Sequence, residues 1–267
     1  MKTISFASAS HVGMVRSENQ DAVGNFPIEN PTVPSPKGQL FIIADGMGGH
    51  AGGREASRLA VETIQKVYFA CGNSSNQECL RIAFKEANAV IYEASLHNPQ
   101  LNGMGTTCIA LVMQGNLATI AHIGDSRLYR ISARTIEQMT NDHSKVAEMV
   151  RRGLLTQEEA SVHPERSMLY RAMGVHLDMQ FDVLNNIELG SNEFYLMCTD
   201  GLTSVVEPHE IQEVVVTHPL QGVCSTLIDL ANFRGGPDNV TVQCIQVGDD
   251  DSFLRKVIDK TTFKRKK

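Results

Sequence analysis

Aspartates within two residues of a glycine or asparagine recur in widely separated segments of this chain. Several lie just after a short apolar run, which is typical of a buried strand that carries a carboxylate at its end. The segments are 19–21, 45–49, 124–126, 200–201 and 235–239. Carboxylates that converge from distant segments repel one another, so unless several stay protonated they need cations to be stable. We therefore expect a metal centre built from oxygen ligands.

Asp45 is central to this expectation because it ends the apolar run 41–44. An isolated Asp-Gly pair usually marks only a turn, but aspartates of this kind in five segments favour a cation site. Oxygen donors without sulfur indicate Mg²⁺ or Mn²⁺ rather than Zn²⁺. Gly46 permits a sharp turn, after which its carbonyl oxygen can also face a metal. Such sites rarely recruit imidazole, so we expect His11, His50 and His143 to form hydrogen bonds instead.

Arg16 lies three residues before Asn19 and close in sequence to the first acidic segment. The planar fork of a guanidinium matches two oxygens of a phosphoryl group at once. An isolated arginine is more often a surface residue or the partner of a carboxylate. Beside a cluster of metal-binding aspartates, phosphate binding is the better interpretation.

Two other kinds of phosphate chemistry are disfavoured by the sequence. The spacing Gly46-x-Gly48-x-x-Ala51 fits a dinucleotide-binding fingerprint, but the nearest acidic candidate, Glu62, lies inside a helical pattern instead of ending a second strand. No Gly-Lys-Ser/Thr follows, so a nucleotide-binding phosphate loop is not supported. The chain also has no Cys-x5-Arg motif of the kind that forms a phospho-cysteine intermediate.

The elements that must position these residues fall into groups of strands and groups of helices. Apolar periods of three and four predict one helix after Gly53 and a second around 80–91, joined by 71–76 into an antiparallel pair. Residues 144–173 suggest short helices on an exposed excursion, and helices are also expected at 207–216 and 219–232. Strands are expected at 2–9, 39–44, 106–113, 117–123, 127–131, 180–189, 193–199 and 239–247, with a proline-rich loop at 27–38. This order predicts an α+β fold with antiparallel sheets.

The composition is that of an ordinary globular protein of 267 residues. It has no long apolar stretch and no leader pattern, so we expect a cytoplasmic protein without a membrane span. The net charge of −6 argues against nucleic-acid binding. The six cysteines form no Cys-x-x-Cys pair, and Cys108, Cys198 and Cys244 lie in apolar runs, which indicates a reducing compartment. The charged tail 249–267 is expected to be a solvated terminus.

Seven motifs occur in an order that resembles the metal-dependent serine/threonine protein phosphatases of type 2C, in their compact bacterial form. They are Arg16-x-x-Asn19-Gln20-Asp21, Asp45-Gly46-Met47-Gly48-Gly49-His50, Gly105-Thr106-Thr107, Gly124-Asp125-Ser126-Arg127, Asp142-His143-Ser144, Cys198-Thr199-Asp200-Gly201-Leu202 and Gly236-x-Asp238-Asn239-x-Thr241. The resemblance implies two packed antiparallel sheets flanked by antiparallel helix pairs, a four-layer αββα sandwich. It also implies a catalytic domain over 1–248, with a flap at about 144–173, followed by the tail 249–267.

The resemblance assigns the metal ligands residue by residue. Asp45 would bridge two ions, Mn²⁺ or Mg²⁺. Asp200 and Asp238 would complete the shell of one ion. Asp21 and the Gly46 carbonyl would serve the other, directly or through water.

A third ion is also implied by the bacterial members of the family. Asp125, sharing Asp200, resembles its ligand, and Asp142 is the alternative. Ser204 stands where some members have a further aspartate, which weakens this site. Gln20 replaces a glutamate found in many members, and Met47 replaces a histidine proposed as general acid in animal members, so the proton donor for the leaving group stays open.

Two ions at such a site predict a mechanism without a phospho-enzyme. A water that bridges them loses its proton near neutral pH, and the resulting hydroxide attacks phosphorus in line while Arg16 and the ions offset the charge.

The implied substrates are phosphoserine and phosphothreonine in proteins, so that the enzyme reverses the action of a Ser/Thr kinase, and we expect a monomer. Two alternatives are a non-catalytic binding module, which should lack essential aspartates, and a hydrolase of small phosphate esters.

Overall fold

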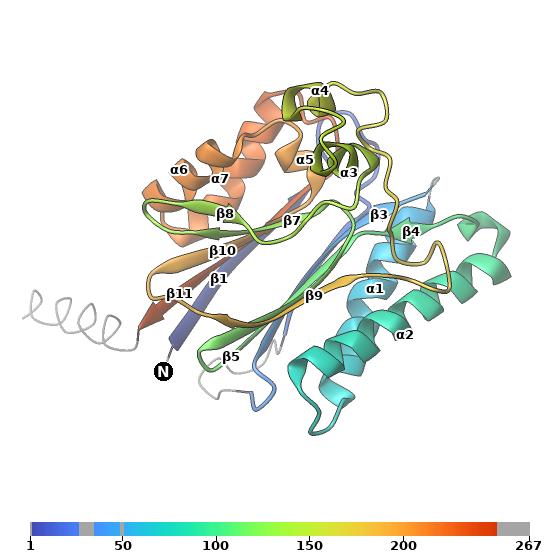
Figure 1. The fold of residues 1–267 in the computed structure, drawn as a ribbon, viewed down its shortest axis with the longest axis horizontal. Coiled ribbons are helices and arrows are strands. Elements are labelled where there is room, and N and C mark those ends of the chain that lie inside the picture. Colours follow the sequence, from blue (N-terminus) through green and yellow to red (C-terminus); the bar gives the residue numbers. More distant parts are fainter. Residues whose placement is uncertain (1, 27–34, 49–50, 250–267) are drawn as a thin grey trace, which may run out of the picture.

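The computed structural model describes residues 2–26, 35–48 and 51–249 of the chain. Two antiparallel sheets pack face to face, and helices cover the outer face of each sheet (Figure 1). This arrangement confirms the predicted α+β class and the αββα order of layers. The proline-rich stretch 27–34, His50 and the tail from 250 lie outside the described residues.

The first sheet contains the two ends of the chain that the structure describes. Its strands, in spatial order, are β1 (Lys2–His11), β11 (Val240–Asp249), β10 (Glu193–Cys198), β7 (Arg127–Ile131) and β8 (Ile136–Gln138). Its outer face is covered by α5 (Asp200–Thr203), α6 (Pro208–Thr217) and α7 (Leu220–Phe233).

The second sheet carries the first two acidic segments. Its strands, in spatial order, are β2 (Asp21–Phe26), β3 (Gln39–Met47), β5 (Cys108–Gln114), β6 (Leu117–Ile123) and β9 (Asp182–Glu188), and the short β4 (Gly105–Thr106) pairs with the end of β3. Its outer face is covered by the antiparallel helices α1 (Ala51–Ala70) and α2 (Asn76–His97), with a 3₁₀ turn, η1 (Pro99–Leu101), after them.

Three apolar layers hold these elements together, and β3 shows how one strand serves two of them. Leu40, Ile42 and Ala44 face α1 and α2, whereas Phe41 and Ile43 face the other sheet. All five side chains are buried. Because successive side chains of a strand point to opposite faces, a run that is apolar throughout must be covered on both sides. Strand β3 therefore lies at the centre of the molecule and brings its end, with Asp45, to a fixed position.

Several elements differ from the sequence prediction in existence or extent. Strand β2 was not predicted because Asp21, Gly24 and Asn25 interrupt its apolar pattern. The short β8 and the single turn α5 were also not predicted. Residues 144–173 contain two short helices, as expected, α3 (Lys145–Arg151) and α4 (Gln157–Ser161). Strand β11 continues to Asp249, one residue into the expected tail.

The cysteines also differ from the expectation of a reducing compartment, in which all of them stay unpaired. The structure joins Cys71 to Cys79 across the turn between α1 and α2. The turn reverses the chain and brings the two Cα atoms to 5.6 Å, within the range that a disulfide spans. Cys108, Cys198, Cys224 and Cys244 are buried and free. Among the described residues, no helix is both long and apolar enough to cross a membrane.

Candidate metal centre

Four of the predicted aspartates meet where strands of both sheets end. Asp21 begins β2 and lies opposite Asp45 of β3 in the strand register. Asp200 follows β10 and opens α5, and Asp238 precedes β11, which pairs with β10. Buried strands on both sides of the sandwich thus deliver carboxylates from sequence positions far apart to one place. Together with Asp125, which follows β6, we call these residues the aspartate cluster.

The electrostatics of the aspartate cluster are those of like charges held together. Burial, followed by repulsion from Asp21 and Asp200, raises the pKa of Asp45 well above its usual range. Burial and repulsion from Asp238 raise the pKa of Asp200. Burial raises the pKa of Asp21 to about 7, although two hydroxyl donors act in the opposite direction. Without cations, these acids retain protons that ordinary aspartates have lost at neutral pH.

Asp21 provides a direct test of whether divalent cations fit here. Its Oδ2 accepts hydrogen bonds from Thr241 Oγ1 at 2.6 Å and from Thr199 Oγ1 at 3.0 Å. Its Oδ1 is buried and has no hydrogen-bond partner among the described residues. A buried oxygen without a donor is destabilising unless something else satisfies it. The potential metal ligands are oxygen atoms, most of them from carboxyl groups, and Mg²⁺ and Mn²⁺ prefer such ligands. The residues therefore fit the expected ions.

Asp45 is fixed by its neighbours through its main chain, and its carboxyl group makes a hydrogen bond with Asp200. Its carbonyl accepts from Thr106 Oγ1 at 2.8 Å and from the Thr107 amide at 2.9 Å. Its own amide donates to Thr107 Oγ1 at 3.1 Å, and that hydroxyl is 2.7 Å from Ser126 Oγ. Thr106 and Thr107 belong to one of the seven motifs in the sequence. The structure gives them a positioning role.

Gly46 and Gly53 allow the start of α1 to pack against the end of β3. A Cβ atom on Gly46 would lie 2.0 Å from the Gly53 carbonyl oxygen, which no real side chain tolerates. A Cβ atom on Gly53 would lie 2.6 Å from Gln20 Oε1. Ser57 of α1 ties the same corner together by donating to the Gln20 carbonyl at 2.6 Å. Glycine is required here because the backbones of three segments are in contact.

Arg16 lies on the loop between β1 and β2, and Asn239 holds that loop in place. The Asn239 side chain accepts from the Gln20 amide at 2.8 Å and donates to the Val12 and Glu18 carbonyls at 2.9 Å. The guanidinium of Arg16 pairs with the Asp238 carboxylate at 2.7 Å while its side chain stays 56% exposed. Arg16 is therefore anchored at the rim of the aspartate cluster and open to solvent.

Asp125 and Asp142, the two candidates for a third ion, differ in their surroundings. Burial, with repulsion from Asp200 and Asp142, raises the pKa of Asp125 to about 8. Asp142 instead receives a bidentate contact from Arg127, with Oδ2 2.7 Å from one guanidinium nitrogen, and a further hydrogen bond from Gln138 at 2.9 Å. The charge of Asp142 is thus already compensated by an arginine.

His122, His143 and Asp182 form a second group of potential ligands below the flap. The imidazole rings of the two histidines stack with centroids 4.8 Å apart. His143 Nδ1 accepts the Gly124 amide at 3.1 Å, which places the ring proton on Nε2, and Nε2 faces Asp182 Oδ2 at 3.2 Å. A protonated nitrogen cannot bind a metal, and the Arg171 guanidinium already lies 3.2 Å from it. We interpret His143 and Asp182 as a hydrogen-bonded pair that supports the segment 144–173, whereas neither ring nitrogen of the buried His122 has a hydrogen-bond partner among the described residues.

Other residues singled out by the sequence lie around the cluster. His11 Nδ1 accepts the Gly13 amide at 2.9 Å, and His50 lies outside the described residues. Met47, at the end of β3, lines a hollow of about 460 Å³ together with residues between 167 and 180. The hollow lies between the end of β3 and residues 167–180.

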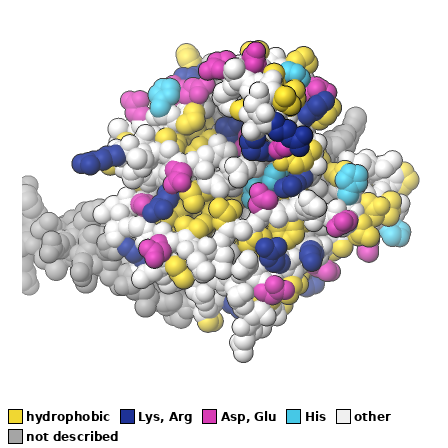
Figure 2. Space-filling view, in the orientation of Figure 1, with side chains coloured by type: hydrophobic (Ala, Val, Ile, Leu, Met, Phe, Trp, Pro, Cys, Tyr) yellow, Lys and Arg dark blue, Asp and Glu magenta, His cyan; other side chains and the backbone are white. Residues whose placement is uncertain are grey.

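A positively charged surface lies over the flap. Figure 2 shows lysine and arginine side chains gathered in the region of α3. This helix ends with Arg151 and is followed by Arg152, and both contact Glu148. An exposed cationic surface of this kind attracts anionic ligands toward the molecule.

Comparison with known proteins identifies the family. The family model for protein phosphatase 2C matches residues 10–227. The serine/threonine phosphatase Stp of Listeria welshimeri is 34% identical over 88% of this chain and 92% of its own length. The protein phosphatase PhpP of Streptococcus pneumoniae is 34% identical over 90% of this chain and 96% of its own length.

A solved structure gives the same result for the fold. The catalytic domain of the serine/threonine protein phosphatase PstP, solved in complex with two manganese ions, superposes with a TM-score of 0.81 and 32% identity. The match covers 93% of this chain and 100% of that domain. The chain therefore belongs to the protein phosphatase 2C family and is a protein phosphatase.

Proposed function

We propose that this protein hydrolyses phosphoserine and phosphothreonine in proteins with the help of two divalent cations, Mn²⁺ or Mg²⁺. The observation that carries the proposal is the aspartate cluster, whose members are half-buried, repel one another and, at Asp21 Oδ1, include a buried oxygen without a donor. Such a cluster is stable and ionised at neutral pH only when cations occupy it. Asp45 would lie between the two ions, Asp200 and Asp238 would bind one, and Asp21 with the Gly46 carbonyl would bind the other.

A third ion at Asp125 and Asp200 is a further part of the proposal. At Asp125, burial and repulsion from Asp200 and Asp142 outweigh the opposing charge of Arg127, whereas Asp142 contacts Arg127 directly. These surroundings support Asp125 rather than Asp142 as the ligand. Asp142 would then orient the Arg127 guanidinium through their ion pair.

When bound, two such ions activate water and neutralise phosphoryl oxygens. The residues of this chain contribute position and charge. Arg16 is paired with Asp238, and an ion bound by Asp238 would compete for this carboxylate and make the guanidinium available to two oxygens of the phosphoryl group. A cysteine nucleophile is disfavoured, because burial raises the thiol pKa of Cys198 to about 12 and that of Cys224 to about 11.

Proteins phosphorylated by a Ser/Thr kinase are the proposed substrates. The cationic surface over α3 lies on the flap and would attract a phosphorylated, anionic segment. The buried free cysteines are compatible with a cytoplasmic location, which we also propose, together with a monomeric state.

The test is the release of phosphate from a phosphothreonine peptide in the presence of Mn²⁺. Wild type should be active, and Asp200→Asn, which keeps the shape of the side chain and removes its charge, should lose most of the activity. Equal rates in the two proteins would contradict the proposal. A preference for free phosphoserine or nucleotides over the peptide would indicate a hydrolase of small esters. Absence of Mn²⁺ binding at millimolar concentration would indicate a binding module.

A further inference from the structure

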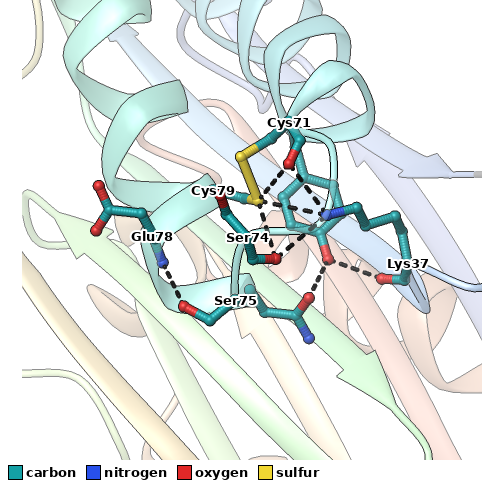
Figure 3. The surroundings of a disulfide bond; sticks show 8 residues. Lys37, Cys71, Ser74, Ser75, Glu78 and Cys79 are labelled. Carbon is teal, nitrogen blue, oxygen red and sulfur yellow. Dashed lines mark hydrogen bonds between the residues drawn. A yellow bond between two sulfur atoms is a disulfide. The ribbon is translucent and has the colours of Figure 1, made fainter.

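The turn between α1 and α2 contains a disulfide at the end of α1 that lies away from the aspartate cluster. Cys71 follows α1 directly, and Cys79 lies in the first turn of α2 (Figure 3). Helix α1 has 20 residues, which corresponds to about 30 Å. The disulfide is therefore remote from the chemistry proposed above, and it must be explained by its own surroundings.

The two sulfur atoms differ in their access to solvent. Cys79 is completely buried, whereas Cys71 is partly exposed. Cys71 also lines an open apolar hollow of about 270 Å³ between the helices, together with Lys66, Val67, Ala70 and Ile82. A reagent that approaches from solvent can therefore reach Cys71 but not Cys79.

Lys37 supplies a positive charge on the buried side of the bond. Its Nζ lies 3.5 Å from Cys79 Sγ and 3.4 Å from each of the Cys71 and Ser74 carbonyl oxygens, as Figure 3 shows. The main chain of Lys37 is held by Tyr68, whose hydroxyl donates to the Lys37 carbonyl at 2.7 Å. The ammonium group is thus placed against one sulfur of the pair by contacts with α1 and with the turn.

We propose that the Cys71–Cys79 pair is a thiol–disulfide exchange site in which a dithiol attacks Cys71 and Lys37 stabilises Cys79 as the leaving thiolate. One thiolate of the dithiol forms a bond to Cys71 Sγ, the bond between the two protein sulfurs breaks, and its electron pair leaves on Cys79 Sγ. The second thiolate of the dithiol then attacks the dithiol's own sulfur that is bonded to Cys71. A disulfide forms within the reagent, and Cys71 leaves as a thiolate. The dithiol ends as a cyclic disulfide, oxidised by two electrons, and the protein gains two electrons and takes up protons from the medium.

The different surroundings of the two sulfurs carry this assignment. Exchange is faster when the attacked sulfur is accessible and when the departing thiolate is stabilised. Here exposure selects Cys71 for attack, and the ammonium of Lys37 selects Cys79 for departure. Reduction would release the covalent link between α1 and α2 and lower the melting temperature, while the metal-dependent activity stays unchanged.

The first experiment identifies the attacked sulfur in the wild-type protein. The oxidised protein is treated briefly with 2-mercaptoethanol, a monothiol, and is then unfolded in denaturant that contains an excess of an alkylating reagent, so that the buried Cys79 also becomes accessible. Cleavage after Glu78 separates the two cysteines for mass spectrometry. We expect the mixed disulfide on Cys71 and the alkyl group on Cys79. A mixed disulfide on Cys79 with the alkyl group on Cys71 would overturn the proposal. So would the finding that Cys71 and Cys79 remain free thiols after the protein has been treated with a thiol oxidant.

The second experiment measures the role of Lys37. Lys37→Met removes the charge at similar length, and Lys85→Met, an exposed lysine on α2, is the matched control. We expect the rate constant for reduction by dithiothreitol to fall about tenfold in Lys37→Met and to be unchanged in Lys85→Met. Equal rates in Lys37→Met and wild type would overturn the role of Lys37. If Lys37→Met does not fold, which circular dichroism would reveal, Lys37→Gln replaces it, and the wild-type mapping still decides the site of attack.

Discussion

Acidic residues in two regions of the molecule have opposite surroundings. On the surface of the layer formed by α6 and α7, Arg234 contacts Glu210 through two nitrogens and lowers the pKa of the Glu210 carboxyl to about 2. In the aspartate cluster, burial and like charges raise the pKa of Asp45 and of Asp200 instead. An acid that has its own arginine contributes to structure. Acids that are buried together without enough positive charge form a site for cations.

The largest effect is expected from Asp45→Asn, which removes the charge at the centre of the cluster. Because Asp45 is the proposed ligand of both ions, kcat/KM on a phosphothreonine peptide with Mn²⁺ should fall by about 10³-fold or more. Asp142→Asn is the matched comparison, since Arg127 already compensates this carboxylate. Its loss should be about tenfold or less. Similar losses in the two variants would remove the distinction between paired and unpaired acids.

Replacing Arg16 should have the next largest effect. Arg16→Lys keeps a positive charge but loses the fork that contacts two phosphoryl oxygens, so kcat/KM should fall by about 10²-fold in steady-state assays. Arg54→Lys serves as the control, because Arg54 pairs with Glu18 nearby at 2.8 Å and has no proposed contact with substrate. Full activity in Arg16→Lys would mean that charge alone suffices.

Thr241→Val tests how the cluster is oriented. The variant removes the hydroxyl that donates to Asp21 Oδ2 at 2.6 Å and keeps the shape of the side chain. Loss of such an orienting contact usually weakens metal affinity about 10- to 100-fold. Titration with Mn²⁺ should show this change, while Thr217→Val, on the exposed end of α6, should bind as wild type does. An unchanged affinity in Thr241→Val would show that Asp21 does not depend on this donor.

The smallest effect concerns stability without metal. The folded-state pKa of Asp125 is raised to about 8, so between about pH 4 and pH 8 the folded protein binds more protons than the unfolded chain. Stability of the metal-free protein should therefore fall as pH rises through this range. Asp125→Asn removes this penalty and should raise the free energy of unfolding by about 1 to 2 kcal/mol at pH 8 and by little at pH 4.

Thermal unfolding in a chelator at the two pH values measures this difference. A variant that is less stable than wild type at pH 8 would contradict the repulsion that we assign to Asp125. Added Mn²⁺ should reverse the order of the two proteins, because only wild type has the carboxylate.

Most of the framework followed from the sequence because its strands are long apolar runs. The sequence could indicate positions near strand ends for Asp45 and Asp200, because Asp45 follows an apolar run directly and Asp200 follows one after Thr199. Strand β2 was missed because Asp21, Gly24 and Asn25 interrupt its apolar pattern, and the loop before it is held by a distant residue, Asn239, which accepts from the amide of Gln20. The donation of Thr241 to Asp21 joins residues 220 positions apart, so no local pattern could indicate it. The Cys71–Cys79 pair depends on how the turn reverses the chain.

The most direct test of the central claim is calorimetric titration of the metal-free protein with Mn²⁺ at neutral pH, in buffers of different ionisation enthalpy. Because the cluster retains protons without metal, we predict that wild type binds at least two ions and releases protons as it does so. Asp45→Asn should lose most of this binding. Binding without proton release, or equal binding by wild type and Asp45→Asn, would contradict the claim that cations hold the aspartate cluster together.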